Sequence, residues 1–352
     1  MSRILVVRTD RLGDLILTLP LFPALRKSFP GAHLSLLVRR YPGEIALGDP
    51  AIDGFLWYDD GARLRSFAGM LREIRRERFD ACIVAHPTLR LALLMFLAGI
   101  PVRIGSGYRI YGLLFNRRVF THRRTAERHE AEYNLELLEP LGCGVPAPGS
   151  VGATIAIPDE ARARVRGLLR DGGMSAGERL VVIHPGSGGS AREWPLASFS
   201  ALAAELSGRP GLRVVVTGTS GESARAAILV DGTGGRARNL CGMLTVKELA
   251  ALLREAALVV ANSTGPIHIA AAVGTAVLGF YPQIPVMGRV RWGPRTARSR
   301  VLVPDRDPAC ADCRKSGGGE CACMASISVR DALHAAEDLL AAAIPSPPVG
   351  VA

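Results

Sequence analysis

The stretch from residue 258 to residue 281 constrains the fold more tightly than any other part of the sequence. An apolar run, Leu258 to Ala261, stops at the polar turn Asn262-Ser263-Thr264-Gly265-Pro266. A helical pattern of small and apolar residues follows, and a second apolar run begins after Gly274. Pro266 suits the first turn of that helix, where its missing N–H is not needed. The order is therefore strand, turn, helix, strand, as in an α/β domain.

The turn itself has two interpretations. Its hydroxyls and backbone N–H groups lie at a helix N-terminus, which favours an anion such as phosphate. The alternative is a helix cap without a ligand. His268, inside the helix, is likewise either a satisfied helix residue or a support for the turn.

The alternation of apolar strands with helical patterns recurs along the chain and predicts an α/β fold with parallel sheets. Apolar strands are expected at residues 3–8, 34–38, 55–58, 80–85, 179–184, 213–217, 258–261 and 276–281. A single helix is expected over about residues 15–28, between the first two of these strands. A chain of 352 residues is too long for one small domain, so we expect two.

A linker rich in proline and glycine, residues 146–152, divides the chain. We expect an N-terminal domain over residues 1–150 and a C-terminal domain over residues 151–328. The last helix and the tail, residues 329–352, are expected to pack back on the N-terminal domain. Two such halves would place a cleft between the carboxyl ends of their sheets, where α/β proteins bind ligands.

The formal net charge of +11 comes almost entirely from arginine, since lysine occurs only at Lys27, Lys247 and Lys315. Basic chains attract anions such as nucleic acid, phosphorylated small molecules or an anionic membrane surface. Only 5% of the residues are aromatic, and no nucleic-acid-reading motif stands out, which argues against nucleic acid. Residues 103–128 hold seven arginines and one acid, Glu127. This segment is either a solvated loop or a surface for a polyanionic substrate.

The sequence also bears on location. The chain enters its first strand without a secretory signal, and its longest apolar helix candidate, residues 91–100, is too short to span a bilayer. We therefore expect a cytoplasmic protein, or one peripheral to the inner face of the cytoplasmic membrane. The sequence does not define an oligomeric state.

The loop from Gly186 to Ala191 formally fits the dinucleotide pattern G-x-G-x-x-A after a strand. In that pattern the helix starts within the glycines, whereas here Arg192-Glu193-Trp194-Pro195 intervenes. The next strand ends in Thr217-Gly218-Thr219, without the acid that would bind ribose. A nicotinamide or flavin enzyme is therefore disfavoured.

A sugar-nucleotide site suits the C-terminal half better. Backbone N–H groups in the Gly186 loop and at Thr264-Gly265 could bind phosphates. Arg192 supplies a cation, and Glu222 could bind ribose hydroxyls. In the N-terminal half, Asp14 lies at the tip of the first loop, where a helix dipole stabilises a carboxylate. The alternative for Asp14 is an ordinary helix-start residue.

Three segments of the chain resemble one known family: residues 4–38, residues 181–195 (VVIHPGSGGSAREWP) and residues 262–281 (NSTGPIHIAAAVGTAVLGFY). They are similar to glycosyltransferase family 9, the family of ADP-heptose:lipopolysaccharide heptosyltransferases. The resemblance spans about residues 3–340 and implies a GT-B fold of two Rossmann-like domains. It also implies inverting, metal-independent transfer with no required cofactor. The C-terminal domain would bind the ADP-sugar donor, and the N-terminal domain would bind the lipopolysaccharide acceptor.

The resemblance assigns roles residue by residue. Asp14 matches the general base, which takes the proton of the attacking acceptor hydroxyl. Arg192 and the N–H groups near Gly265 would stabilise the departing diphosphate, and Leu244 matches a position whose backbone reads adenine. The expected donor-binding residues are Gly186, Ser187, Gly188, Arg192, Glu222, Leu244, Ser263, Thr264, Gly265, Pro266 and His268. The expected acceptor-binding residues are Arg11, Gly13, Arg109, Arg117 and Arg118.

Two positions depart from the family pattern, both on the donor side. Arg192 stands near the place of a lysine, with altered spacing, and Ser263 stands where the family often has aspartate. The transfer chemistry tolerates both changes because Asp14 is intact, but the sugar is less well defined. The alternatives are an enzyme using another nucleotide sugar, a nucleotide-sugar epimerase, and a non-catalytic nucleotide- or glycan-binding protein.

A cysteine cluster near the C-terminus stands apart from this pattern: Cys310-x2-Cys313-x7-Cys321-x-Cys323. Four thiolates suit structural zinc or an iron–sulfur cluster, although CxxC beside CxC is not a standard zinc-ribbon spacing. A disulfide or redox pair, or free thiols, are the alternatives.

Overall fold

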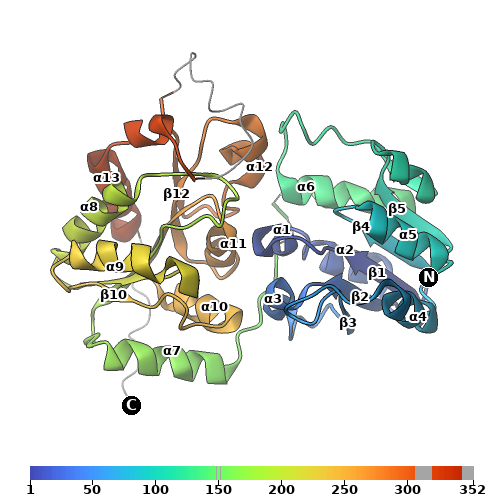
Figure 1. The fold of residues 1–352 in the computed structure, drawn as a ribbon, viewed down its shortest axis with the longest axis horizontal. Helices are drawn as coiled ribbons and strands as arrows, with labels where there is room; N and C mark the ends of the chain where they lie inside the picture. Colours follow the sequence, from blue (N-terminus) through green and yellow to red (C-terminus); the bar gives the residue numbers. More distant parts are fainter. Residues whose placement is uncertain (148, 151, 306–318, 343–352) are drawn as a thin grey trace. The chain divides into compact units, whose positions relative to one another are not determined.

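The computed structural model describes residues 1–147, 149–150, 152–305 and 319–342. The chain divides into two compact units, Met1–Ala156 and Ile157–Ala352 (Figure 1). Each unit contains one six-stranded sheet in which every strand pair is parallel. The predicted α/β class is therefore confirmed.

The N-terminal sheet has the strand order β3-β2-β1-β4-β5-β6. Its strands are β1 (Arg3–Val7), β2 (His33–Val38), β3 (Gly54–Trp57), β4 (Ala81–Val84), β5 (Val102–Ser106) and β6 (Arg117–Val119). The central strands are buried along nearly their whole length, because helices cover both faces of the sheet. That is why they appear in the sequence as unbroken apolar runs.

The C-terminal sheet repeats the same topology, with the order β10-β9-β7-β11-β12-β13. Its strands are β7 (Arg179–His184), β9 (Leu212–Val216), β10 (Arg238–Asn239), β11 (Leu258–Asn262), β12 (Ala276–Phe280) and β13 (Ser299–Leu302). A separate two-stranded sheet pairs β8 (Arg192–Glu193) with β14 (Gly319–Glu320).

In each sheet, successive strands are added first toward one edge and then toward the other. The change occurs between β1 and β4 in the first sheet and between β7 and β11 in the second. In open α/β sheets, ligands bind outside the carboxyl ends of the strands at such a switch point. The loops that follow these four strands are therefore the places to search for function in each unit.

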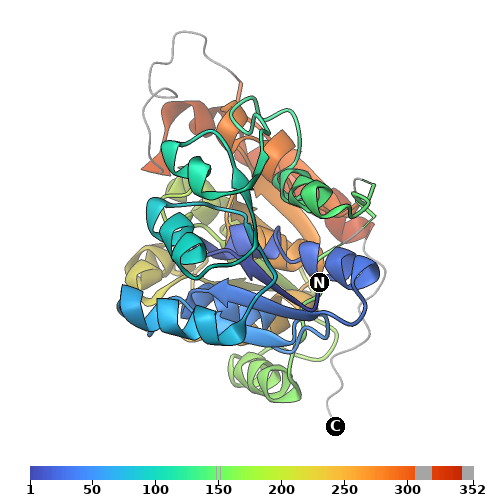
Figure 2. The same ribbon diagram turned by 90° about the vertical axis from the view of Figure 1, so that its right-hand side faces the viewer.

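In the N-terminal unit, α4 (Phe67–Glu77), α5 (Leu89–Leu97) and the 3₁₀ helix η2 (Ile110–Leu114) pack on one face of the sheet (Figure 2). The remaining elements are α1 (Leu12–Ile16), α2 (Leu21–Ser28), α3 (Arg40–Gly43), η1 (Glu44–Ala46), α6 (Glu130–Leu135) and η3 (Glu136–Leu141). The sequence predicts one helix over residues 15–28, but the structure has two, α1 and α2. Pro20 lies between them as the N-cap of α2 and lacks the N–H that a continuous helix would need.

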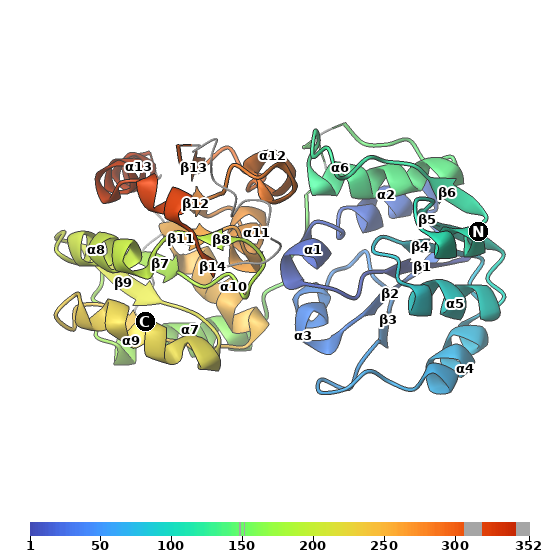
Figure 3. The ribbon, with the colours of Figure 1, turned by 45° about the horizontal axis from the view of Figure 1, so that its top comes forward.

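In the C-terminal unit, α8 (Leu196–Ser207), α9 (Ser223–Asp231) and α13 (Val329–Ala341) share one core with the sheet (Figure 3). The other elements are α7 (Asp159–Asp171), η4 (Ser220–Glu222), α10 (Val246–Glu255), α11 (Gly265–Ala272), η5 (Pro285–Met287), α12 (Arg289–Trp292) and η7 (Ala322–Ser326). The sequence places α13 against the N-terminal domain. Its buried residues, Ala332, Ala336 and Leu339 among them, instead belong to the C-terminal core beside α8 and β12.

Candidate functional site

The loop after β1 brings a buried arginine and two carboxylates together at the carboxyl edge of the N-terminal sheet. Arg8 directly follows β1, and its side chain is 3% exposed. It donates from Nε to Oδ1 of Asp10 at 2.7 Å and from Nη2 to Oδ2 at 2.9 Å, and it forms a second ion pair with Asp14 in α1. Asp14 is therefore held beside a fixed cation.

A third carboxylate approaches the same guanidinium from α6. Oε1 of the buried Glu130 lies 3.5 Å from Nη1 of Arg8. Arg123 donates to Glu130 from the other side and forms an ion pair with it. The two arginines and the three carboxylates of Asp10, Asp14 and Glu130 form one network, in which acids outnumber bases by one.

Hydrogen bonds tie α6 to the backbone around Asp14. Asn134 donates from Nδ2 to the Leu17 carbonyl at 3.0 Å and to Oγ1 of Thr18 at 3.2 Å. Thr18 in turn donates to the carbonyl oxygen of Asp14 at 2.8 Å. Because α6 fixes both Arg8 and this turn, it determines where the Asp14 carboxylate lies.

The environment of Asp14 suits a proton acceptor. Burial raises the pKa of Asp14 to about 6; Arg8 opposes the rise, and the negative charges of Asp10 and Glu130 add to it. A carboxyl group with such a pKa can both accept and release a proton near neutral pH. The surrounding carboxylates raise the pKa of Arg8 in spite of its burial, so the cation stays charged.

His86 adds an imidazole to the edge of this network. It follows β4, the strand across the switch point from β1, and its Nδ1 lies 3.7 Å from Oδ2 of Asp10. Burial lowers the pKa of His86, although Asp10 opposes the shift. The imidazole therefore lies beside Asp10 at a distance longer than a hydrogen bond, and in its neutral form it adds no charge to the network.

The expected acceptor-binding residues fall into two groups. Arg11 and Gly13 flank Asp14, Arg11 as the exposed N-cap of α1 and Gly13 inside that helix. Arg109 precedes η2, and Arg117 and Arg118 lie on the edge strand β6; all three are exposed. The structure thus places the first group at the Asp14 site and the second on the outside of the N-terminal unit.

In the C-terminal unit, the loop after β7 is fixed by a buried carboxylate. Glu193 accepts hydrogen bonds at 2.8 Å from both the backbone N–H and the hydroxyl of Ser187. It also forms an ion pair with Arg225 at 3.2 Å. The sequence assigns Ser187 to the donor through this loop, but its N–H and hydroxyl both point to Glu193. Ser187 therefore shapes the loop.

The loops across the second switch point are joined by Asn262, the last residue of β11. It accepts from the backbone N–H of Trp194 at 2.8 Å and donates to the carbonyl of Pro185 at 2.6 Å. Ser190 donates to the carbonyl of Ser263 at 3.1 Å. The Gly186 loop and the start of α11 consequently form one continuous edge.

Glu222 lies against the same loop and has little room around it. An added Cβ at Gly186 would come within 1.7 Å of Oε1 of Glu222, so a larger residue there would require the Glu222 side chain to move. Oε2 of Glu222 accepts from the N–H and the hydroxyl of Thr219, both at 2.8 Å. These bonds hold the pKa of Glu222 below its ordinary value although burial opposes the shift. One oxygen of Glu222 thus holds the η4 turn, while the other faces Gly186.

The remaining expected donor residues line the rest of this edge. Thr264 is the N-cap of α11 and makes no side-chain capping bond, and Pro266 lies in the first turn. The Ser263 hydroxyl bonds Tyr281, which opposes the rise that burial gives the pKa of that tyrosine. Other expected members are Gly188 in the loop, half-buried Arg192 on β8, half-buried Leu244 before α10, Gly265 at the start of α11 and buried His268 within it.

The cysteine hypothesis falls partly outside the described residues. Cys310 and Cys313 lie there, whereas Cys321 and Cys323 are half-buried at the start of η7. Within the described ranges, no group of three or more His, Cys, Asp or Glu side chains is placed to hold a metal ion.

Among the residues that the structure describes, no helix has the length and hydropathy needed to span a bilayer.

Sequence reasoning missed the residues that position the candidate ones. Arg8, Asp10 and Glu130 surround Asp14, while Glu193 fixes the loop after β7. The sequence places Asn262 in the polar turn but does not predict that it joins this turn to Trp194 and Pro185. The only local signal was that Arg8 and Asn262 stand at strand ends next to a switch point. Glu130 is 122 residues from Arg8, so no local pattern could pair them.

Comparison with known proteins supports this description. The model of glycosyltransferase family 9 (heptosyltransferase) matches residues 68–316. Lipopolysaccharide heptosyltransferase 3 of Escherichia coli is 27% identical over 278 residues, covering 76% of this chain and 80% of that protein.

Two solved structures share the fold along almost the whole chain. A glycosyl transferase family 9 structure from Veillonella parvula has a TM-score of 0.82 at 23% identity and covers 97% of both chains. The E. coli ADP-heptose lipopolysaccharide heptosyltransferase II has a TM-score of 0.77 at 19% identity and covers 97% of this chain and 99% of that one. These similarities identify the two-unit architecture as the GT-B fold. The chain belongs to glycosyltransferase family 9 and is a glycosyl-transferring enzyme.

Proposed function

We propose that this enzyme moves a heptose-like sugar from an ADP-sugar to a lipopolysaccharide core or a related anionic glycan, with inversion and without a metal ion. The observation that carries the proposal is the half-buried Asp14 carboxylate with its raised pKa at the switch point of the N-terminal sheet. Relatives named as lipopolysaccharide heptosyltransferases, one of them with ADP-heptose, support the substrate class.

In this mechanism the Asp14 carboxylate takes the proton from an acceptor hydroxyl. The oxygen forms a bond to the anomeric carbon of the sugar as the bond from that carbon to the diphosphate oxygen breaks. The electron pair leaves with ADP, and attack from the opposite face inverts the anomeric centre. Arg8 fixes the orientation of Asp14, and its charge limits the rise in the pKa of that carboxyl.

The C-terminal unit would hold the donor. The backbone N–H groups at the start of α11, helped by the positive end of the helix dipole, suit the diphosphate. Arg192 adds positive charge as the diphosphate leaves. Glu222, through the oxygen that faces Gly186, is the candidate for the ribose hydroxyls, and the backbone of Leu244 is the candidate for adenine.

A second donor remains a candidate because of one residue. Ser263 stands where the resembling family often has aspartate, and its hydroxyl bonds Tyr281. A neutral side chain in place of a carboxylate changes which sugar hydroxyls can be bound. The same protein fold and base could therefore serve another nucleotide sugar.

The proposal also places the enzyme at the cytoplasmic side of the inner membrane, as a peripheral protein without a required cofactor. A structural zinc or iron–sulfur site at the cysteine cluster would be independent of the transfer chemistry.

Thermal unfolding with a panel of nucleotides tests the donor assignment. ADP and ADP-sugars should raise the unfolding temperature more than UDP or GDP at the same concentration, because a ligand that binds only the folded state stabilises it more the more tightly it binds. Greater stabilisation by UDP or GDP would overturn ADP as the nucleotide. Sugar isomerisation without an acceptor would point to an epimerase.

A further inference from the structure

The outer side of the α4, α5 and η2 layer carries exposed apolar side chains. In η2, Ile110 is 90% exposed and Leu113 is 74% exposed. Residues three apart lie on one side of a 3₁₀ helix, so these two project together. Tyr111 and Leu114 lie on another side of the helix and pack against the core of the unit. The helix is therefore apolar on its inner side, which packs on the core, and also on its outer side, which faces solvent.

The neighbouring helix α5 continues this apolar surface. Phe96 is 46% exposed and Leu97 is 41% exposed. The guanidinium of Arg103 lies 5.3 Å from the ring centre of Phe96 and donates from Nε to the carbonyl of Leu114 at 2.9 Å. This arginine links the end of α5 to the end of η2.

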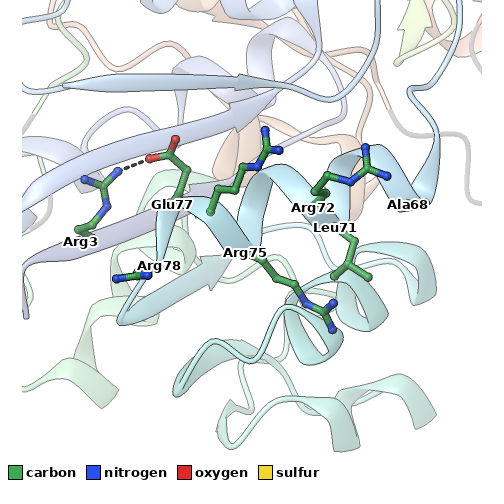
Figure 4. Close-up of a pocket in the computed structure, with 8 residues that line it drawn as sticks. Arg3, Ala68, Leu71, Arg72, Arg75, Glu77 and Arg78 are labelled. Carbon is green, nitrogen blue, oxygen red and sulfur yellow. Dashed lines mark hydrogen bonds and ion pairs between the residues drawn. The ribbon is translucent and has the colours of Figure 1, made fainter.

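On the other side of α5, helix α4 contributes a basic hollow of about 900 Å³ (Figure 4). Its lining includes five arginines and one glutamate: Arg3, Arg72, Arg75, Arg76, Arg78 and Glu77. Glu77 is neutralised by an ion pair with Arg3, drawn as a dashed line in Figure 4. Four arginines of the hollow are thus left without a carboxylate partner among the described residues.

One of these arginines connects the hollow to the apolar surface. Arg75 donates from Nη2 to the carbonyl of Leu97 at 2.8 Å and from Nε to the same oxygen at 3.2 Å. A second guanidinium, on Arg72, projects from the same helix in a different direction (Figure 4). The basic and the apolar groups therefore occupy adjoining elements of one layer.

The hollow is separate from the Asp14 site. Arg3 begins β1, and α4 ends shortly before β4 begins at Ala81. The hollow therefore lies toward the amino ends of these parallel strands, whereas Arg8 and Asp14 follow the carboxyl end of β1. An anion in this hollow would not be the leaving diphosphate.

We infer that the outer surface of α4, α5 and η2 is a docking surface for an anionic lipid bilayer. Positive side chains beside exposed apolar ones are the pattern of a protein that lies on an anionic membrane. The guanidiniums of the hollow would bind lipid phosphates, and Ile110, Leu113 and Phe96 would enter the headgroup boundary. The inference deepens the proposed function, because it rests on an acceptor that is carried at a membrane.

Vesicle co-sedimentation of the full chain, without donor or acceptor, tests the inference independently of sugar transfer. The wild type should bind vesicles of phosphatidylcholine mixed with phosphatidylglycerol and should not bind phosphatidylcholine alone. Each cation near an anionic surface contributes about a fivefold gain in affinity, so Arg72→Gln/Arg76→Gln should bind roughly 25-fold more weakly. The control Arg164→Gln/Arg170→Gln removes the same charge from exposed positions of α7 and should bind like the wild type.

A second pair of variants tests the apolar half. Ile110→Ser/Leu113→Ser should lose about tenfold or more in affinity for the anionic vesicles. Ile228→Ser, at an exposed position of α9, should lose nothing. Thermal unfolding of all variants checks that they fold. The arginine changes lie in α4 and the apolar changes lie in η2, so a folding defect in one element would leave the other test valid.

Three results would overturn the inference. Equal loss in the α4 and α7 variants would mean that only net charge matters. Displacement from vesicles by inorganic phosphate at matched ionic strength would assign the hollow to a soluble phosphate. Absence of vesicle binding, with Ile110→Ser/Leu113→Ser converting a dimer to a monomer, would assign the apolar surface to a second copy of the chain.

Discussion

Asp14 is an acid whose properties depend on the residues around it. Its pKa is raised because it is buried and because Asp10 and Glu130 carry like charge, while Arg8 limits the rise. A base of this kind is ionised at neutral pH but still binds a proton well enough to remove one from a hydroxyl. The network therefore accounts for the raised pKa of Asp14 as well as for the position of its carboxylate.

Replacing Glu130 by glutamine tests this electrostatic account. The change removes one negative charge beside Asp14 and keeps the shape of the side chain, so the pKa of Asp14 should fall. In the wild type, kcat/KM for transfer should drop as the pH falls through about 6. In Glu130→Gln this acid limb should move to lower pH. A limb that does not move would show that Glu130 has no influence on the base.

Ionisation of Asp14 should lower the free energy of unfolding, whereas ionisation of an ordinary ion-paired acid raises it. Because its pKa is raised from 3.8 to about 6, the folded state binds the proton more tightly than the unfolded state. The ionised group therefore destabilises the fold as the pH rises through this window, and the effect is complete above it. Asp14→Asn should then be more stable than the wild type at mildly alkaline pH, by up to about 3 kcal/mol.

Denaturant unfolding across pH measures this difference. The difference in unfolding free energy should shrink toward zero as the pH falls below the ordinary pKa of aspartate, since Asp14 is then protonated in both the folded and the unfolded wild type. A variant that is less stable than the wild type at alkaline pH would mean that the Arg8 ion pair outweighs the burial of the carboxylate.

At the scale of elements, the sequence predicts the strands well because parallel strands buried on both faces appear as apolar runs. Strand β7 is observed at the predicted residues 179–184. The helix predicted over residues 15–28 is divided at Pro20.

From the sequence, residues 103–128 are interpreted as either a solvated loop or a surface for a polyanionic substrate, and α6 begins just beyond them. Three of the arginines in that segment, Arg103, Arg123 and Arg128, bond within the unit. Composition alone could not separate them from exposed Arg117 and Arg118.

The close approach of the Gly186 backbone to the Glu222 carboxylate, in the loop after β7, can be tested by substitution. Gly186→Ala would push a methyl group against Glu222, whose carboxylate is held by two bonds from Thr219. We expect a loss of about 1–3 kcal/mol in unfolding free energy and weaker binding of ADP. Gly167→Ala in α7 is the matched control, because a Cβ there meets nothing within 4 Å. It should be stabilising by about 0.5–1 kcal/mol. Equal effects of the two substitutions would contradict the close approach at Gly186.

At the scale of the whole molecule, the repeated strand order places the candidate residues of each unit at a switch point. The sequence singles out Asp14, the Gly186 loop and the 262–266 turn as candidates because motifs of a known family mark them, and their roles stay predictions. The Arg8 network, the hydrogen bonds of Glu193 to Ser187 and the exposed apolar side of η2 were not predicted. Each depends on contacts between segments far apart in the chain, or on exposure that composition does not reveal.

Metal independence is a property of the whole enzyme and is tested by chelation. Dialysis against EDTA should leave the transfer rate unchanged, because Arg192 and backbone N–H groups are proposed to stabilise the leaving diphosphate. The control is the same enzyme after Mg²⁺ is added back. A rate that falls on chelation and returns with Mg²⁺ would contradict metal-independent transfer.

The central claim is that Asp14 removes a proton from an acceptor while ADP leaves the donor sugar. Its most direct test is the release of ADP from ADP-heptose by the wild type and by Asp14→Asn, with and without a lipopolysaccharide-core acceptor. The wild type should release ADP only when the acceptor is present. Asp14→Asn should bind ADP as tightly as the wild type but transfer the sugar about 100-fold to 10,000-fold more slowly. Transfer at the full rate by Asp14→Asn would contradict the account.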